Sequence, residues 1–345
     1  METQSMVQVL VVEDSITTRR FLADLINRMP GLMVCGEAAT GAEAIELAHE
    51  MRPNVISMDI HMPQLDGVEA TKQIMTTLPT PIVIVSSGVG QREVDVAMLA
   101  IEAGALAAIE KPTAMPQDEQ KRQNYLRMLR LMAGVRVIRR HRMPEISMPP
   151  LMANPKTLPE IVVIGASAGG PGAVAHILSK LPADFPIPVV VVQHLSGEFV
   201  PGFANWLGRR CELPVRIAMD GEYPNAGYIW VAPGNFHIQL NRNGQFVLNS
   251  DKGNARHQPS ITYLFQSVAD VFGANALAIL LTGMGDDGAD GMGTMRVRGA
   301  RTIAQDEETS VVFGMPAAAI DRGAAEYVLP LQEIPQALLA LVGLR

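Results

Sequence analysis

Short apolar runs alternate with amphipathic stretches along the first third of the chain. The runs are VQVLVV, LMVCGEA, NVISMD and PIVIVSS. The stretches between them repeat apolar residues at helical spacing, and strands that alternate with helices of about 10 to 15 residues favour parallel βαβ units covered on both faces. We therefore predict an α/β domain over residues 1–134, which ends in a helix between Gln117 and Gly134.

A proline-rich segment follows this domain. The stretch MPEISMPPLMANPKTLP holds five prolines and shows no periodicity, which is typical of an extended linker, so we place a linker at residues 135–157. Apolar runs and amphipathic stretches then alternate again, which predicts a doubly wound, mostly parallel α/β domain over residues 158–345. Within it, GYIWVAPGNFHIQLNRNGQFVLN predicts short strands joined by turns, with an antiparallel hairpin at Asn243 and Gly244.

Composition and charge exclude several classes of protein. Apolar residues make up 48% of the chain and charged residues 18%, which is the balance of folded domains and not of disordered ones. The net charge of −7 has the wrong sign for a nucleic-acid binder. Two distant cysteines, Cys35 and Cys211, cannot build a disulfide framework. With no apolar run of about 18 residues and no signal peptide, we expect a cytoplasmic protein that does not insert into membranes.

Three carboxylates follow the predicted strands of the first domain. Glu13 and Asp14 come directly after VLVV, and Asp59 comes directly after VISM. The carboxyl ends of parallel strands form the ligand-binding edge of open α/β sheets, and carboxylates gathered there repel one another unless a hard cation such as Mg²⁺ lies among them. Ser86 and Lys111 end two further runs at the same edge. A hydroxyl, an ammonium and a metal beside Asp59 predict a phosphoryl acceptor.

The string IVVIGASAGGPG predicts a buried strand, a glycine-rich turn and a helix, with Ser167 at the carboxyl edge of the second sheet. One interpretation is a dinucleotide-binding turn. It is weakened because Ser167 replaces the middle glycine of GxGxxG, and because no acidic residue ends the next strand. The other interpretation is a GxSxG nucleophile elbow, in which Gly165 and Gly169 allow close backbone approach.

Two further groups favour the nucleophile. His194 ends the run PVVVVQH, and Asp286 and Asp287 follow ALAILLTGMG, so three strands deliver a hydroxyl, an imidazole and a carboxylate to one edge. In such a triad the serine attacks, the histidine takes its proton and the carboxylate orients the imidazole. The order Ser, His, Asp differs from the Ser, Asp, His of ordinary α/β hydrolases and disfavours that fold.

The first 125 residues or so resemble the receiver domain of two-component response regulators, chiefly through DIHMPQLDG. The resemblance implies a flavodoxin-like fold, with a cis peptide bond suggested before Pro112. It further implies a phosphoacceptor at Asp59, Mg²⁺ ligands at Glu13, Asp14 and Asp59, and phosphoryl-binding groups at Ser86 and Lys111. Two positions depart from the pattern. Ala108 stands where receivers usually carry an aromatic switch residue, and His61 stands where receivers attached to this kind of output commonly carry an acid.

The second domain resembles the catalytic domain of the chemotaxis protein-glutamate methylesterases, the CheB family. The blocks that carry the resemblance are GASAGG, VVVVQH, VAPGNFH, RHQPSI, LTGMGDDGADGM and TIAQDEETSVVFGMP. It implies that Ser167 is the nucleophile, His194 the general base and Asp287 the orienting acid, with the backbone N–H of Met284 in the oxyanion hole. Asp286 replaces a common Asn, and Ala168 replaces a frequent Thr.

The resemblance implies hydrolysis of glutamate γ-methyl esters on methyl-accepting chemoreceptors, deamidation of receptor glutamines, and a histidine kinase as phosphodonor. We expect no cofactor in the esterase, and we expect the receiver to cover the esterase cleft until Asp59 is phosphorylated. His237 and His257 are interpreted as scaffolding of the cleft. Two other functions stay open: a non-catalytic scaffold that acts as phosphoryl sink or docking module, and, with little support, a nucleotide-dependent oxidoreductase.

Overall fold

The computed structural model describes residues 6–87, 91–135, 158–251, 253 and 255–344. The chain divides into two compact units, Met1–Arg140 and His141–Arg345, and each is an α/β fold, as predicted. The last helix of the first unit ends at Ala133, and the first strand of the second begins at Ile161. Apart from Val135, the predicted linker lies outside the described residues.

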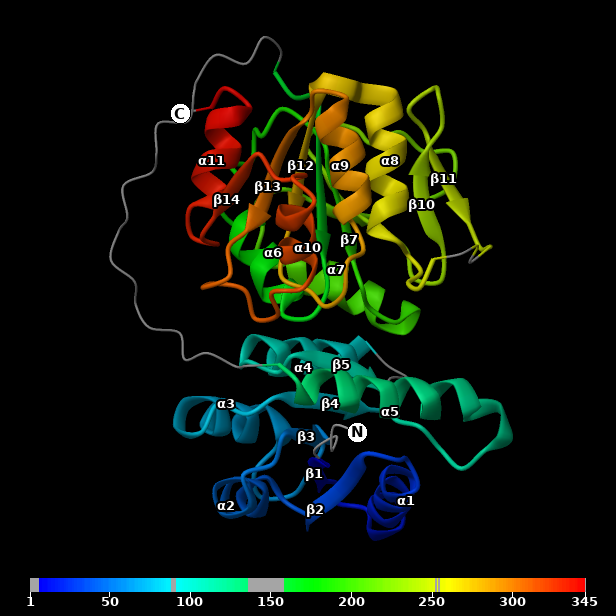
Figure 1. Ribbon diagram of the computed structural model, residues 1–345, viewed down its shortest axis with the longest axis vertical. Coiled ribbons are helices and arrows are strands. Elements are labelled where there is room, and N and C mark those ends of the chain that lie inside the picture. The colour runs from blue at the N-terminus through cyan, green and yellow to red at the C-terminus, as the bar shows by residue number, and fades with distance from the viewer. Residues whose placement is uncertain (1–5, 88–90, 136–157, 252, 254, 345) are drawn as a thin grey trace. The chain divides into compact units, whose positions relative to one another are not determined.

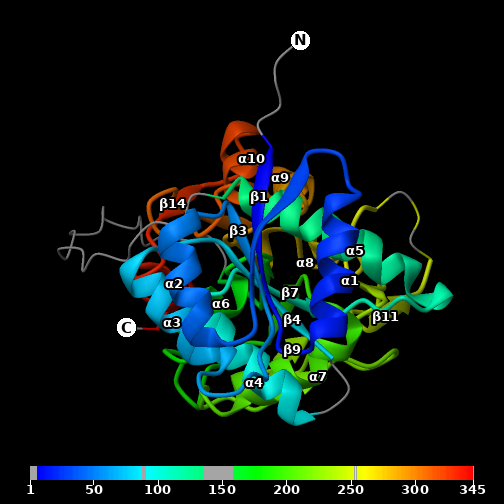
Figure 2. The same cartoon turned by 90° about the horizontal axis from the view of Figure 1, so that it is seen from below.

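The described residues of the first unit form a five-stranded parallel sheet in the order β2-β1-β3-β4-β5. Its strands are β1 (Val7–Val12), β2 (Leu32–Ala38), β3 (Val55–Met58), β4 (Ile82–Ser86) and β5 (Ala107–Glu110). Its helices are α1 (Ile16–Asn27), α2 (Gly41–Met51), α3 (Gly67–Thr77), α4 (Gln91–Glu102) and α5 (Glu119–Ala133). Figure 2 shows α1 and α5 on one side of the sheet and α2 and α3 on the other. All residues of β3 and β4 are buried, because helices cover both faces.

Side-chain caps fix where three of these helices begin. The Ser15 hydroxyl accepts a hydrogen bond from the Thr18 N–H at the start of α1, and Thr40 caps α2 in the same way. The Asp66 carboxylate accepts two backbone N–H groups at the start of α3. Such caps typically stabilise a helix by about 1 kcal/mol each. They set the exact lengths of the loops that carry polar residues at the carboxyl edge of the sheet.

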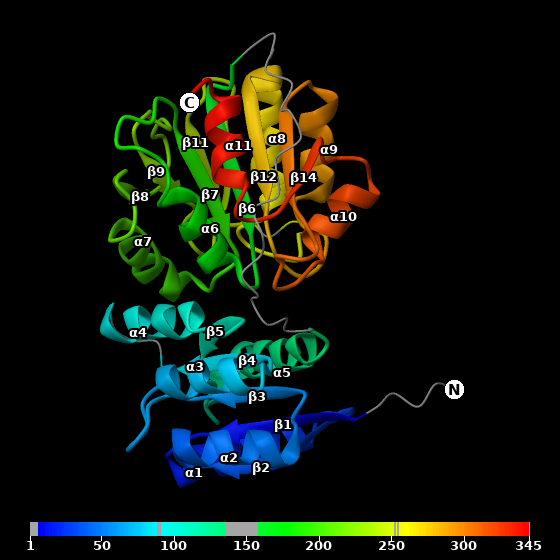
Figure 3. The same ribbon diagram turned by 90° about the vertical axis from the view of Figure 1, so that its left-hand side faces the viewer.

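The described residues of the second unit form a seven-stranded parallel sheet in the order β14-β13-β12-β6-β7-β9-β8, and a separate antiparallel pair, β10 and β11. Its strands are β6 (Ile161–Ala166), β7 (Val189–Gln193), β8 (Val215–Ile217), β9 (Ile229–Val231), β10 (His237–Leu240), β11 (Phe246–Asn249), β12 (Ala276–Leu280), β13 (Arg301–Gln305) and β14 (Tyr327–Leu329). Its α-helices are α6 (Gly170–Leu178), α7 (Val200–Gly208), α8 (Ile261–Phe272), α9 (Ala289–Val297), α10 (Met315–Asp321) and α11 (Ile334–Leu341). Figures 1 and 3 show α8 and α9 on one face of the sheet, with α6 and α11 on the other.

The middle of this unit refines the hairpin prediction. The predicted hairpin is present as β10 and β11, and Gly244 in its turn has a φ of +81°. The residues Ile229–Val231 instead join the parallel sheet between β7 and β8, because their buried apolar side chains suit a strand covered on both faces. The suggested cis bond before Pro112 is wrong, since in the described part of the chain the cis bond is Gln258–Pro259.

The direction of winding reverses at β6, which places a ligand-binding crevice at its carboxyl end. The chain steps from β6 to β7 on one side and from β12 to β13 on the other, and such switch points are where open α/β sheets bind ligands. In the paired register Ala166 of β6 lies beside Gln193 of β7, and Gly165 lies beside Leu280 of β12. The residues that follow these three strands therefore leave the sheet side by side. None of the helices described is long and apolar enough to span a membrane.

Candidate functional site

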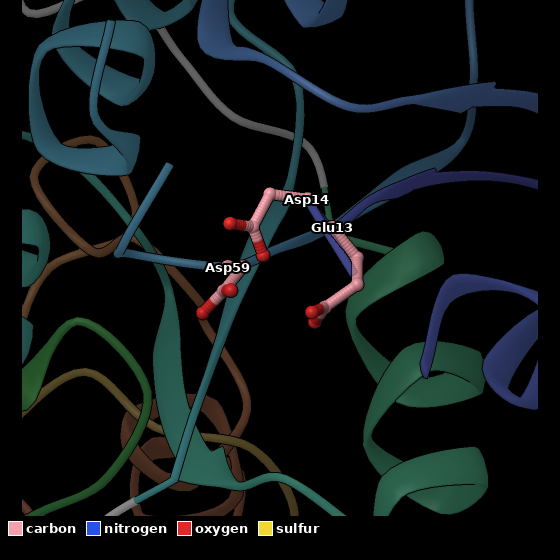
Figure 4. A group of neighbouring side chains, drawn as sticks. All are labelled: Glu13, Asp14 and Asp59. Atoms are coloured by element: carbon pink, nitrogen blue, oxygen red, sulfur yellow. The ribbon is translucent and has the colours of Figure 1, made fainter. Parts of the chain in front are cut away.

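Three carboxylates meet at the carboxyl edge of the first sheet, as predicted. Glu13 and Asp14 follow β1, Asp59 follows β3, and one oxygen of each carboxylate lies within 4.8 Å of the others (Figure 4). Glu13 and Asp59 are buried, whereas Asp14 is exposed, so the cluster is open to solvent on one side. These hard oxygen donors form the kind of ligand set that Mg²⁺ prefers.

Lys111 supplies the positive charge of this cluster. Its Nζ lies 2.7 Å from Oε2 of Glu13 and 2.9 Å from Oδ2 of Asp59. Burial alone would lower the pKa of Lys111, but the negative charge of Asp59 and the bonds to both carboxylates outweigh burial and raise it. Burial and the charge of Asp59 raise the pKa of Glu13, against the effect of Lys111. One ammonium thus pairs with two of the three clustered carboxylates, and the set fits an additional cation.

Ser86, the last residue of β4, is a buried hydroxyl beside this cluster. It is 1% exposed, and its Oγ has no hydrogen-bond partner among the described residues. The Lys111 N–H donates to the Ser86 carbonyl over 2.7 Å, which ties the two residues together. A buried hydroxyl without a partner costs free energy unless a ligand completes it. A phosphoryl oxygen on Asp59 is a ligand of the right kind.

Ser167 lies where the second sheet changes winding direction. Its N–H donates to the Thr282 carbonyl over 3.0 Å, and the His194 N–H donates to the Ala166 carbonyl over 3.0 Å. The nucleophile candidate is therefore flanked by the segments that follow β7 and β12. Gly283 permits this approach, because a Cβ there would lie 2.7 Å from Cβ of Ser167.

His194 and Asp287 form a hydrogen-bonded pair. The distance from His194 Nε2 to Asp287 Oδ2 is 2.9 Å, and the two side chains are 9% and 12% exposed. The other ring nitrogen, Nδ1, is buried and has no hydrogen-bond partner among the described residues. An Nε2–H that donates to the carboxylate leaves the lone pair of Nδ1 available to accept a proton.

Asp287 is held by more than the histidine. Its carboxylate accepts hydrogen bonds from Ser260 Oγ over 2.8 Å, Ile261 N over 2.8 Å and Thr262 N over 3.1 Å. Burial acts to raise the pKa of Asp287, but the bonds to His194, the backbone and Thr262 outweigh it, so the pKa lies well below the usual range for Asp. The acid of the pair is ionised and fixed in orientation.

Comparison with known proteins identifies the family. The family model for CheB methylesterase matches residues 162–338, and that for the response regulator receiver domain matches residues 9–121. The protein-glutamate methylesterase/protein-glutamine glutaminase of Nitrosospira multiformis is 45% identical over 99% of this chain and 98% of its own length. The chain belongs to the CheB methylesterase family. A protein of the same description from Syntrophus aciditrophicus is 42% identical over 98% of this chain and 99% of its own.

A solved structure agrees with this assignment. The crystal structure of the Thermotoga maritima CheB methylesterase catalytic domain matches with a TM-score of 0.52 and 41% identity, and the match covers 53% of this chain and 99% of that one. The predicted family, the two-part α/β architecture and the esterase class are thereby confirmed. The roles of individual residues in this CheB-family chain stay predictions.

Where this chain departs from the family pattern, the structure shows what surrounds each change. Asp286 is half exposed, and its Oδ2 lies 2.8 Å from a guanidinium nitrogen of Arg322, which also binds Asp290. The extra anion is therefore compensated. Ala108 is buried in β5 and offers no aromatic ring, and His61 is exposed. We expect the acceptor chemistry to survive both receiver changes.

The interpretation of both histidines as scaffolding fits their positions. The His257 ring stacks on the His194 ring, with centroids 4.3 Å apart and an angle of 13° between the planes. His237 is fully buried, and its Nδ1 accepts the Ser260 N–H. Met284 follows Gly283, and its N–H makes no hydrogen bond within the described residues, as an oxyanion donor requires.

Sequence reasoning missed two of the residues around the His194–Asp287 pair. Ser260 and the start of α8 lie within the block RHQPSI, but nothing in the block says that its serine contacts Asp287. The second is Gln193, whose Nε2 donates to the Ser167 carbonyl over 2.8 Å and to the His194 carbonyl over 3.3 Å. It precedes the predicted base in VVVVQH, and it ties the nucleophile turn to the histidine turn.

Proposed function

We propose that this chain hydrolyses glutamate γ-methyl esters on methyl-accepting chemoreceptors, and deamidates receptor glutamines, with Ser167, His194 and Asp287 as the reacting and orienting groups. The observation that carries the proposal is the His194–Asp287 bond of 2.9 Å. It leaves the unpartnered Nδ1 at the sheet edge where Ser167 lies. The related proteins named above, which are methylesterases and glutaminases, support the choice of substrate.

The geometry suggests the following steps. The Ser167 Oγ attacks the γ-carbonyl carbon while Nδ1 of His194 takes its proton, and Asp287 stabilises the imidazolium. The carbonyl oxygen becomes an oxyanion, to which we assign the Met284 N–H as donor. The C–O bond then breaks, and methanol leaves with the proton from His194. Water attacks the acyl-enzyme in the same way and releases the glutamate. With a glutamine substrate, ammonia is the leaving group.

Release of methanol tests the esterase. Purified protein is mixed with receptor carrying labelled methyl groups, and volatile label is measured. We expect Ser167→Ala to abolish release and to prevent labelling by a fluorophosphonate at neutral pH. Ser179→Ala is the matched control, because among the described residues its hydroxyl donates to the His176 carbonyl at the end of α6 and to no group of the proposed site. An unaffected rate in Ser167→Ala would remove the mechanism, and absence of labelling in the wild type would favour a scaffold.

The first unit is proposed to control this activity. We infer that Asp59 accepts a phosphoryl group from a histidine kinase, with Lys111 and Ser86 binding the transferred oxygens. Glu13, Asp14 and Asp59 are the residues that would hold Mg²⁺, which neutralises charge on phosphoryl oxygens when it is bound. Both cysteines are free thiols, in keeping with a reducing cytoplasm, where we place the protein.

A small-molecule phosphodonor tests this control. We expect acetyl phosphate with Mg²⁺ to raise the methanol release rate of the wild type and to add one phosphoryl group by mass. Asp59→Asn should abolish both effects. Asp24→Asn, an exposed carboxylate on α1, should retain both. Full phosphorylation of Asp59→Asn would assign the acceptor elsewhere.

A further inference from the structure

A buried chain of hydrogen bonds extends behind the catalytic pair. From His194 it passes to Asp287, then from Asp287 Oδ1 to Ser260 Oγ over 2.8 Å, and from the Ser260 N–H to Nδ1 of His237 over 3.1 Å. Ser260 is 3% exposed and His237 is 0% exposed. Water therefore has little access to these bonds, and each polar group depends on its neighbour.

The start of α8 makes this chain unusual. Ser260 is the residue before the helix, where a serine commonly caps the first N–H groups with its own oxygen. Here its side chain makes no such cap bond. Asp287, which lies 26 residues after Ile261 and 25 after Thr262, instead accepts the N–H groups of both residues. The Ser260 hydroxyl donates to the same carboxylate.

His237 fixes Ser260 from the other side. Because its Nδ1 accepts the Ser260 N–H, this nitrogen carries no proton, and a neutral ring carries its proton on Nε2. The ring also packs against Tyr263, with centroids 4.5 Å apart. The backbone of Ser260 is thus held by His237, and its hydroxyl donates to Asp287.

We propose that Ser260 is a positioning residue of the esterase: its hydroxyl holds Oδ1 of Asp287, so that Oδ2 faces Nε2 of His194. This inference rests on the proposed function. Ser260 touches no reacting atom and acts through the carboxylate alone. The charged and titratable groups that the structure describes around these hydrogen bonds are Asp287 against His194, His257 stacked on His194, His237 against Ser260, and Tyr263 against His237.

Removal of the hydroxyl has two consequences. The carboxylate loses one of the bonds that fix its orientation, so turnover falls. The carboxylate that has lost this hydrogen bond also stabilises the imidazolium of the neighbouring histidine more strongly. The acidic limb of the pH profile therefore moves to higher pH. A residue that merely supported the fold would lower stability and leave the pH profile in place.

The test compares three variants of the full chain. Ser260→Ala is expected to lower kcat on the order of tenfold, with KM within about twofold, and to move the acidic limb of kcat/KM to higher pH. Ser260→Thr keeps the hydroxyl and should restore both. Ser267→Ala removes another buried α8 hydroxyl, which donates to the Leu264 carbonyl and accepts the Leu240 N–H. It should lower the melting temperature and leave kcat and the pH profile unchanged.

Two outcomes would overturn the proposal. One is a folded Ser260→Ala variant with wild-type kcat and pH profile. The other is a Ser267→Ala variant whose kcat falls as much as that of Ser260→Ala. A measurement without substrate separates this result from failure of the proposed function. In the NMR spectrum of histidine-labelled protein, with His194 assigned by a His194→Gln variant, the His194 ring should titrate at higher pH in Ser260→Ala. That shift is expected whatever the substrate, and its absence contradicts the positioning role.

Discussion

Both units place carboxylates at the carboxyl edge of a parallel sheet, but they treat them in opposite ways. At the edge of the first sheet, Glu13 and Asp59 share the Lys111 ammonium, Asp14 lies beside them, and the Ser86 hydroxyl has no partner in the described part of the chain. At the edge of the second, Asp287 alone accepts bonds from His194, Ser260 and the first N–H groups of α8. The first edge holds more negative charge than its single ammonium balances, whereas the carboxylate of the second is surrounded by donors.

The difference fits the role that we propose for the carboxylates at each edge. A phosphoryl acceptor must gain and lose a large anion and its counter-cation, so unsatisfied groups let the incoming ligand supply the missing partners. An orienting acid must keep one geometry through every step of a reaction, so its donors are built in and need no reorganisation. The same fold edge therefore serves as a receptive site or a preorganised one, according to how many hydrogen-bond donors surround the carboxylates.

The largest expected effect comes from removing the charge of Asp287, the carboxylate surrounded by hydrogen-bond donors. Asp287→Asn is predicted to lower kcat for methanol release by about 10⁴-fold, because the histidine loses its orientation and the imidazolium its counter-charge. Initial rates on methyl-labelled receptor measure this loss. A fall of less than tenfold would show that Asp287 is not the orienting acid.

The same substitution should also destabilise the fold more than a substitution at the edge of the first sheet does. Asp287→Asn is expected to lower the free energy of unfolding at pH 7 by about 2 kcal/mol, since buried donors lose a charged acceptor. Because the folded pKa of Asp287 lies below its unfolded value, this contribution is complete above about pH 4 and is lost as the pH falls through the folded pKa. Calorimetry at pH 7 and below pH 4 should show the difference from wild type shrinking. An equal loss at every pH would contradict the assignment.

Asp59→Asn is the matching substitution at the carboxyl edge of the first sheet. It relieves repulsion with Glu13 but removes one partner of Lys111, so we expect a change within about 1 kcal/mol at pH 7. A loss as large as that of Asp287→Asn would mean that the two edges are not different in kind.

A smaller effect is expected from removing the Lys111 ammonium at the edge of the first sheet. Lys111→Met removes a positive charge that competes with a metal cation for Glu13 and Asp59. One unit charge at about 4 Å is worth about 1 kcal/mol in a water-like medium, so Mg²⁺ should bind about fivefold more tightly. Thermal shift at increasing Mg²⁺ concentration measures this affinity. Weaker binding in the variant would show that Lys111 organises the ligands and does not compete.

The smallest effect is expected at Arg322. Arg322→Ala leaves Asp286 uncompensated near the oxyanion donor, and we expect a two- to threefold lower kcat that high salt reverses, because exposed charges are screened. The double variant Asp286→Asn with Arg322→Ala should regain the wild-type rate. Failure of the double variant to recover would assign Arg322 a role in packing.

The sequence predicted the parts of the molecule that depend on local pattern. The apolar runs located the parallel strands of both units, and polar residues directly after them, such as Asp59 and His194, lie at the predicted edges. Ile229–Val231 could not be assigned from its own residues, because a three-residue apolar run suits either a hairpin or a buried parallel strand. The His194 contact of Asp287 was predicted, but the Ser260 contact of Asp287 and the Arg322 contact of Asp286 were out of reach. Ser260 and Arg322 meet them only through the packing of α8 and α10, which no local pattern encodes.

The capping of α8 by Asp287 has a consequence for how the domain matures. Since the first N–H groups of the helix gain their acceptor only when the loop after β12 packs against them, the helix start and the proposed orienting acid assemble in one event. A partly folded second unit would then hold a serine but no oriented base. On the proposed mechanism, the protein would stay inactive toward esters until the loop after β12 has packed against the start of α8.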